Sequence, residues 1–201
     1  MNNILVFLKT GGIIMFPLSF LAITLLAIII DKIFFYCKYL KITKNIETLI
    51  YEPSFCLQTW QNSLQKFSTK HFYYILWHLI KQNNDISQNN KLLENKATSL
   101  LKKIEKQMFS GVWILETIVS VAPLLGLLGT IVGMSTSFQI LGSTELNPAG
   151  ITSGVAESLI ATAFGLVIAI VALFVFNLWQ RVANHTLDNL EIIANTALAE
   201  K

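Results

Sequence analysis

The sequence predicts an all-α integral membrane protein with three transmembrane helices. Of its 201 residues, 53% are hydrophobic and only 13% are charged, whereas a soluble domain typically carries about 25% charged residues. The chain also contains three charge-free runs of 21, 28 and 23 residues, and a helix needs about 20 apolar residues to cross a bilayer core. Each run is therefore long enough to span a membrane.

The first charge-free run, residues 10–30, predicts a transmembrane helix over residues 12–31. No cleavage site of the A-x-A kind follows this run, so we interpret it as a retained anchor rather than as a signal peptide. Residues 1–11 are then an N-terminal segment on the outer side of the membrane.

The positive charges gather in one segment of the chain. Twelve of the 15 Lys and Arg residues lie within residues 31–111, and none lies within residues 112–180. Positive charges near the ends of transmembrane helices stay on the cytoplasmic side. Residues 32–111 are therefore predicted to form a cytoplasmic helical domain, and the predicted orientation is N-out/C-in.

The second run, residues 117–144, predicts a transmembrane helix over residues 112–141. Apolar residues at helical spacing from Leu93 lead into it without a breaker, so we expect one long helix that extends into the cytoplasmic domain. A glycine lowers the stability of a soluble helix by about 1 kcal/mol. In lipid, however, small residues let helix backbones approach closely, which favours helix association. One stripe of this helix, which faces either other helices or a pore, carries three glycines: Gly126, Gly129 and Gly133.

Residues 142–153 contain two glycines, one proline and no Lys or Arg, which predicts a short turn on the outer side. The third run predicts a transmembrane helix over residues 154–180, and a weaker helical pattern continues over residues 181–201 as a cytoplasmic C-terminal helix. The third helix has its own stripe of small residues, which is suited to helix packing and includes Ala161, Gly165 and Ala169.

Three polar side chains in or near these helices are candidates for function. Thr130 and Thr162 are expected at similar depth in two antiparallel helices, each beside small residues. They either contribute hydroxyls to an ion path or bond carbonyls of their own helices, and their spacing leaves both interpretations open. Glu157 is either an acid favoured by the dipole of the third helix or an ion-pathway or subunit-contact residue.

The sequence contains no arrangement that predicts an enzyme. It has no partnered Ser, His and acid and no phosphate loop, and nothing in it indicates a cofactor or a metal site. The formal net charge of +3 is too small to predict nucleic-acid binding. The expected surroundings are a lipid membrane.

Two linked segments resemble the ExbB/TolQ/MotA proton-channel family, and its ExbB and TolQ branch most. They read P-L-L-G-L-L-G-T-I-V-G-M-S-T-S-F at residues 123–138 and G-V-A-E-S-L-I-A-T-A-F-G-L-V-I-A-I at residues 154–170. The resemblance is strong over residues 112–181. It implies a proton-channel and motor subunit of the bacterial inner membrane that converts proton motive force into mechanical work. That work would serve TonB-dependent outer-membrane transport or Tol-Pal envelope maintenance.

The resemblance also implies partners and roles for particular residues. Family members form a homo-oligomeric pentamer whose second and third helices line a pore around a dimer of a single-span ExbD/TolR-like partner, which acts in turn on a TonB- or TolA-like protein. The family's pore threonines match Thr130 and Thr162, and its glutamate at the entry of the third helix matches Glu157. The family often has a proline where this chain has Val171. The alternative hypothesis is a non-conducting oligomeric membrane scaffold.

Overall fold

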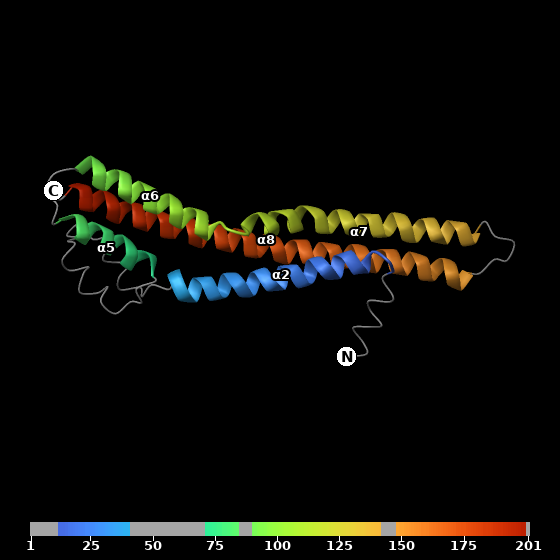
Figure 1. The fold of residues 1–201 in the computed structure, drawn as a ribbon. Coiled ribbons are helices and arrows are strands. Elements are labelled where there is room, and N and C mark those ends of the chain that lie inside the picture. The colour runs from blue at the N-terminus through green and yellow to red at the C-terminus, as the bar shows by residue number, and fades with distance from the viewer. Residues whose placement is uncertain (1–11, 41–70, 85–89, 142–147, 200–201) are drawn as a thin grey trace. The chain divides into compact units, whose positions relative to one another are not determined.

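The computed structural model describes residues 12–40, 71–84, 90–141 and 148–199, and every element in these ranges is helical. In chain order the elements are α2 (Met15–Phe35), a π-helical turn (Tyr36–Leu40), α5 (Phe72–Asn84), α6 (Asn90–Met108), α7 (Val112–Leu141) and α8 (Pro148–Ala199) (Figure 1). Three stretches, which contain α2, α7 and α8, are long and apolar enough to cross a membrane. The described part of the chain is therefore all-α, and its three long apolar helices are those of a multi-pass membrane protein.

The chain divides into two compact units. The span unit consists of Met1–Ile30 and Gly111–Leu178, and the lysine-rich unit consists of Asp31–Ser110 and Trp179–Lys201. The span unit contains most of α2, all of α7 and the first part of α8. The lysine-rich unit contains the end of α2, the π-helical turn, α5, α6 and the last part of α8.

In the span unit α2, α7 and α8 lie side by side (Figure 1). Residue 165 of α8 lies against residue 122 of α7, and residue 158 lies against residue 133, so α7 and α8 are antiparallel. Large apolar side chains point outward from all three helices, which suits a surface that contacts lipid because acyl chains are as apolar as leucine. The buried core is formed by Met15, Leu18, Leu25, Leu115, Ile118, Ala122, Ala161, Ile168, Ala169 and Ala172.

The third helix begins earlier than the sequence predicts. Residues 148–153 were expected in a turn but form the first turns of α8, which starts at Pro148 instead of at residue 154. Proline is favoured at the first position of a helix because its missing N–H would have no partner there. Residues 142–147 of the expected turn lie outside the described residues. From Pro148 the helix continues without a break to Ala199, past Val171 and past the predicted boundary at residue 180.

The expected continuous helix from Leu93 to Trp113 is interrupted. α6 ends at Met108, α7 begins at Val112, and Gly111 between them has a φ of 75°. This backbone conformation is readily adopted only by glycine, which commonly follows the last residue of an α-helix. The apolar spacing was interpreted correctly, but the stop signal of Gly111 was missed.

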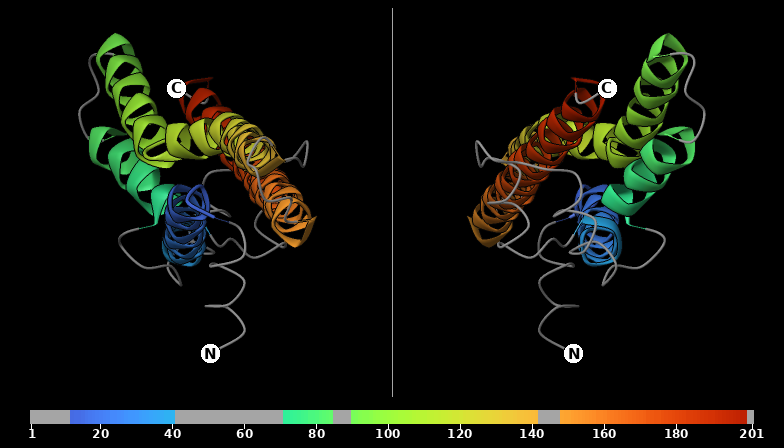
Figure 2. Two further views of the ribbon diagram at one scale, coloured as in Figure 1. Left: turned by 90° about the vertical axis from the view of Figure 1, so that its right-hand side faces the viewer. Right: turned by 90° about the vertical axis from the view of Figure 1, so that its left-hand side faces the viewer.

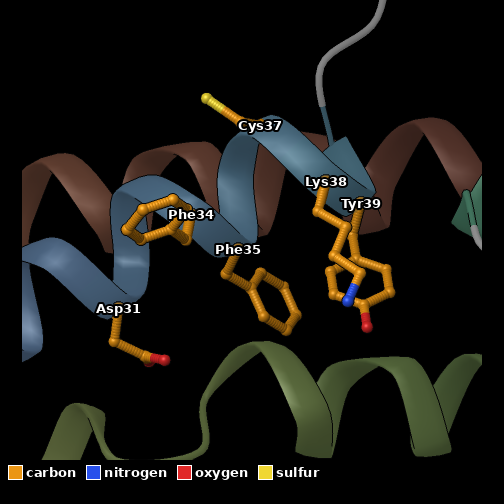
Figure 3. Close-up of a pocket in the computed structure, with 6 residues that line it drawn as sticks. All are labelled: Asp31, Phe34, Phe35, Cys37, Lys38 and Tyr39. Carbon is orange, nitrogen blue, oxygen red and sulfur yellow. The ribbon is translucent and has the colours of Figure 1, made fainter.

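The lysine-rich unit is built around aromatic side chains. α5 contacts α6, and the two helices lie next to each other in the views of Figure 2. The ring of Tyr39 stacks on Phe72 with a centroid distance of 5.5 Å, and the ring of Phe35 meets Trp179 edge to face at 5.8 Å. Figure 3 shows Phe35 and Tyr39 on one side of the chain and Cys37 on the other. The first helix therefore extends past its predicted end at residue 31 because its continuation belongs to this aromatic core.

Lys32 and Trp179 cap the C-terminal end of α6. The Lys32 side chain is only 5% exposed, and its Nζ donates to the carbonyl oxygens of Ser110 at 2.6 Å and Met108 at 3.4 Å. The Trp179 Nε1 donates to the same Met108 oxygen at 2.9 Å, and the Lys32 Nζ lies 4.8 Å from the Trp179 ring centroid. The last carbonyls of a helix lack intrahelical partners and favour a nearby cation. Lys32 therefore stabilises the end of α6 and is not a surface charge.

We predict that Lys32→Met destabilises the lysine-rich unit by about 1–3 kcal/mol, since it removes the charged donor from two carbonyl groups. Lys38→Met is the matched control because Lys38 is exposed. Thermal unfolding in detergent and amide hydrogen exchange near Met108 measure the difference. Equal melting temperatures for the two variants would contradict this account of the cap.

Candidate functional site

The glycine stripe of α7 lies against α8 of the same chain. A Cβ atom added to Gly126 would lie 3.1 Å from the Thr162 Cα, and one added to Gly129 would lie 2.7 Å from the Ala161 Cβ. A Cβ atom on Gly133 would lie 2.7 Å from the Ser158 Cβ. Van der Waals contact between carbon atoms is optimal at about 3.5–4.0 Å, so side chains larger than glycine would push the helices apart.

The small residues of α8 form the other side of this interface. A Cβ atom on Gly165 would lie 2.6 Å from the Ala122 carbonyl oxygen, and one on Gly154 would meet the Ser137 Oγ. Ala161 and Ala169 are buried in the core of the span unit. The two small-residue stripes of the sequence are thus two faces of one interface. All six residues predicted for helix packing are buried: Gly126, Gly129, Gly133, Ala161, Gly165 and Ala169.

Two hydroxyl groups connect the helices across this interface, one from each side. The Thr162 Oγ1 donates to the Gly126 carbonyl oxygen at 2.9 Å, and the Ser137 Oγ donates to the Ile151 carbonyl oxygen at 3.2 Å. Both hydroxyls are also near a carbonyl of their own helix, at 3.2 Å and 3.0 Å. In a membrane such shared donors help antiparallel helices associate. Sequence reasoning placed Ser137 on the same stripe as the glycines but did not predict its hydrogen bond to α8.

Thr130 differs from Thr162 in its surroundings. Its half-buried hydroxyl donates to the Leu127 carbonyl oxygen of its own helix at 2.7 Å. The residue opposite Thr162 is Gly126, which is one turn, about 6 Å, from Thr130 along α7. A carbonyl of its own helix thus holds the Thr130 hydroxyl, whereas the Thr162 hydroxyl also reaches the neighbouring helix.

Glu157 lies against the start of α2. A Cβ atom on Gly12 would lie 2.7 Å from the Glu157 Cδ and would collide with the Glu157 Oε1. Gly12 has a φ of 69°, and Ile14 beside it contacts the space next to Gly129. The N-terminal end of α2 therefore meets both other helices of the span unit. The sequence alone did not predict this contact between Gly12 and Glu157.

No catalytic or metal-binding arrangement occurs among the residues that the structure describes. These residues contain no group of three or more His, Cys, Asp or Glu side chains that could hold a metal ion. A hollow of about 570 Å³ in the lysine-rich unit is bordered by Asp31, Phe34, Phe35, Cys37, Lys38 and Tyr39 (Figure 3). Most of these side chains are exposed, so the hollow is a surface feature.

These features define a class of protein: a helical, multi-pass membrane protein with a tightly packed hairpin of two glycine-containing helices. The sequence pattern of the MotA/TolQ/ExbB proton channel family matches residues 60–192. This match covers more than half of the chain, which therefore belongs to the MotA/TolQ/ExbB proton channel family, and the resemblance seen in the sequence is confirmed.

Relatives with curated names agree with this family. A Synechocystis protein named ExbB-like 3 is 48% identical over 68 residues, which are 32% of each chain. The biopolymer transport protein ExbB of Pseudomonas putida is 44% identical over 38% of this chain and 23% of its own length. That of Aquifex aeolicus is 36% identical over 45% of this chain and 62% of its own length. The chain thus matches less than two thirds of the length of each relative.

We predict that Gly133→Leu destabilises the hairpin of α7 and α8 by about 1–3 kcal/mol, because the added atoms overlap Ser158. Val132→Leu is the control, since Val132 is exposed on the same helix. The melting temperature in detergent should fall only for the glycine variant. An unchanged melting temperature for Gly133→Leu would show that the two backbones are not in close contact.

Proposed function

We propose that this protein is a proton-channel and motor subunit of the bacterial inner membrane. With an ExbD/TolR-like partner it converts proton motive force into mechanical work, either for TonB-dependent outer-membrane transport or for Tol-Pal envelope maintenance. The observation that carries the proposal is the α7–α8 hairpin, which lies inside the segment matched by the proton channel family and contains both candidate threonines.

The proposed topology is N-out/C-in, with residues 32–111 and 181–201 in the cytoplasm. Its support is the concentration of Lys and Arg in the lysine-rich segment and their absence from residues 112–180. The capped end of α6 and the aromatic core around Trp179 would then lie at the cytoplasmic boundary, where Trp and Tyr are enriched.

The proposed ion path includes Thr130, Thr162 and, toward its outer end, Glu157. Both threonine hydroxyls donate to backbone carbonyl oxygens, so each offers its oxygen lone pairs as acceptors. A hydroxyl in this state accepts a hydrogen bond from water or from a protonated carboxylic acid. The two threonines therefore suit the protonated form of a partner's carboxyl group.

The chain itself supplies no titratable group to the middle of this path. Residues 117–144 and 158–180 contain no Asp, Glu, Lys, Arg or His. A proton carrier in the membrane must then come from elsewhere, which supports a single-span partner with a carboxylate inside an oligomeric ring, a pentamer by the family resemblance.

The alternative, a non-conducting oligomeric scaffold, relies on small-residue faces to join one copy of the chain to another. In this structure the small faces of α7 and α8 are buried against each other within one chain. They are not available for contacts between copies, so this observation weighs against the scaffold hypothesis.

We predict that Thr130→Val reduces function roughly tenfold or more, which corresponds to 1.4 kcal/mol from one lost hydrogen bond. The assay is growth of a strain that depends on this protein, with assembly checked by native electrophoresis. Thr136→Val is the matched control because the Thr136 hydroxyl also donates to carbonyl oxygens of α7, those of Val132 and Gly133.

Thr162 needs a different design because its hydroxyl also bonds Gly126 of α7. Thr162→Val should impair both assembly and growth, whereas Thr162→Ser keeps the donor and should retain both. Normal growth of an assembled Thr130→Val variant would contradict the proposed path.

A further inference from the structure

A second hollow in the lysine-rich unit is bordered by the end of α2 and the end of α6. Its volume is about 330 Å³, and it shares Asp31, Phe35 and Tyr39 with the hollow of Figure 3, where these three side chains extend from the same side of the chain. Sites for small ligands typically have volumes of about 300–1,000 Å³, so the hollow is large enough for a small polar group. Its lining residues are Asp31, Lys32, Phe35, Tyr39, Gln107 and Ser110.

The buried Lys32 ammonium gives this hollow a positive charge that no acid pairs with. Its Nζ donates to two carbonyl oxygens and lies 4.8 Å from the Trp179 ring centroid and 5.8 Å from that of Phe35, and none of these groups carries a formal negative charge. In the described part of the chain Lys32 forms no ion pair, and Asp31 beside it is exposed. Buried charges are usually paired. The ammonium has three N–H groups, so one is left for an anionic group in the hollow.

The hollow lies at the depth of phospholipid headgroups. The charge-free run at residues 10–30 has 21 residues, and Asp31 and Lys32 follow it directly. A helix needs about 20 apolar residues to cross the hydrocarbon core, so these two residues are the first beyond that core. Every phospholipid carries a phosphate group at this depth. A phospholipid is therefore the anionic molecule that is always within reach of Lys32.

We propose that this hollow binds the headgroup of an aminophospholipid such as phosphatidylethanolamine. Its phosphate would accept hydrogen bonds from the Lys32 ammonium and the Gln107 amide. Its own ammonium would face the Asp31 carboxylate and the rings of Phe35 and Tyr39, because aromatic faces attract cations. The lining has one formal negative and one formal positive charge, which suits a zwitterionic headgroup better than an anionic one.

Under the proposed topology the bound lipid belongs to the cytoplasmic leaflet. The binding itself does not depend on whether the chain conducts protons. It assigns to Lys32 a role beyond the end of α6, and that role can be measured separately from stability, as the choice among lipids.

Native mass spectrometry of the delipidated full chain in detergent measures this choice. Phosphatidylethanolamine should bind roughly tenfold or more tightly than phosphatidylglycerol or diacylglycerol with the same acyl chains, because only it pairs with both charges. Glycerophosphoethanolamine, which has the headgroup but no acyl chains, should bind more weakly than the lipid. Equal affinity for the three lipids would overturn the proposal, and equal affinity for the headgroup alone would assign the site to a soluble phosphate ester.

Asp31→Asn should reverse the selectivity. Without the carboxylate, the hollow keeps only the positive charge of Lys32, so phosphatidylglycerol should then bind at least as tightly as phosphatidylethanolamine. Asp188→Asn is the matched control, since Asp188 is an exposed acid of the same unit that does not line the hollow. An Asp31→Asn variant with the selectivity of the unmodified chain would contradict the proposed orientation of the headgroup.

Gln107→Glu tests the phosphate side without removing the ammonium that caps α6. Gln107 is exposed, and the added carboxylate should repel the phosphate and weaken phosphatidylethanolamine binding roughly tenfold. Asn95→Asp is the control, because Asn95 is an exposed amide about 18 Å earlier along α6. Lys32→Met should lose the selectivity altogether. Unchanged lipid binding by a folded Gln107→Glu variant would show that no phosphate occupies the hollow.

Discussion

The close approach of the α7 and α8 backbones is the constraint on which the rest of the span unit depends. Glycines stand on both sides of the interface, and at Gly129, Gly133 and Gly165 an added Cβ atom would overlap an atom of the opposite helix. In lipid no hydrophobic force drives two apolar helices together, so close packing and shared hydrogen bonds must do so. The Thr162 and Ser137 hydroxyls supply such bonds, one from each helix.

This interface also determines which polar groups remain outside it. Once the small faces of α7 and α8 are buried against each other, Thr130 lies to one side of the contact and Glu157 to another, beside α2. The polar residues of the hairpin therefore have different surroundings in the structure, although their neighbours in the sequence are similar. In the lysine-rich unit the buried ammonium of Lys32 has a comparable organising role, because it serves the end of α6 together with Trp179.

The sequence was sufficient to predict the three apolar helices and the small-residue faces, since length, charge and helical spacing are local properties. It was not sufficient for the start of α8 at Pro148 or the break at Gly111, because a single proline or glycine outweighed the periodic pattern around it. Other contacts depend on the orientation of each helix about its own axis. These are the different hydrogen bonds of Thr130 and Thr162 and the contact between Gly12 and Glu157. That rotation is set by packing and cannot be derived from the spacing within one helix.

The most direct test of the account is proton flux into liposomes under an imposed membrane potential, measured for this chain alone and with its single-span partner. Residues 117–144 and 158–180 of this chain contain no titratable side chain, so the account predicts no potential-driven flux from the chain alone and a clear flux from the complex. Replacing the partner's intramembrane carboxylate by its amide should abolish that flux. Proton flux through the chain alone, or none through the intact complex, would contradict the central claim.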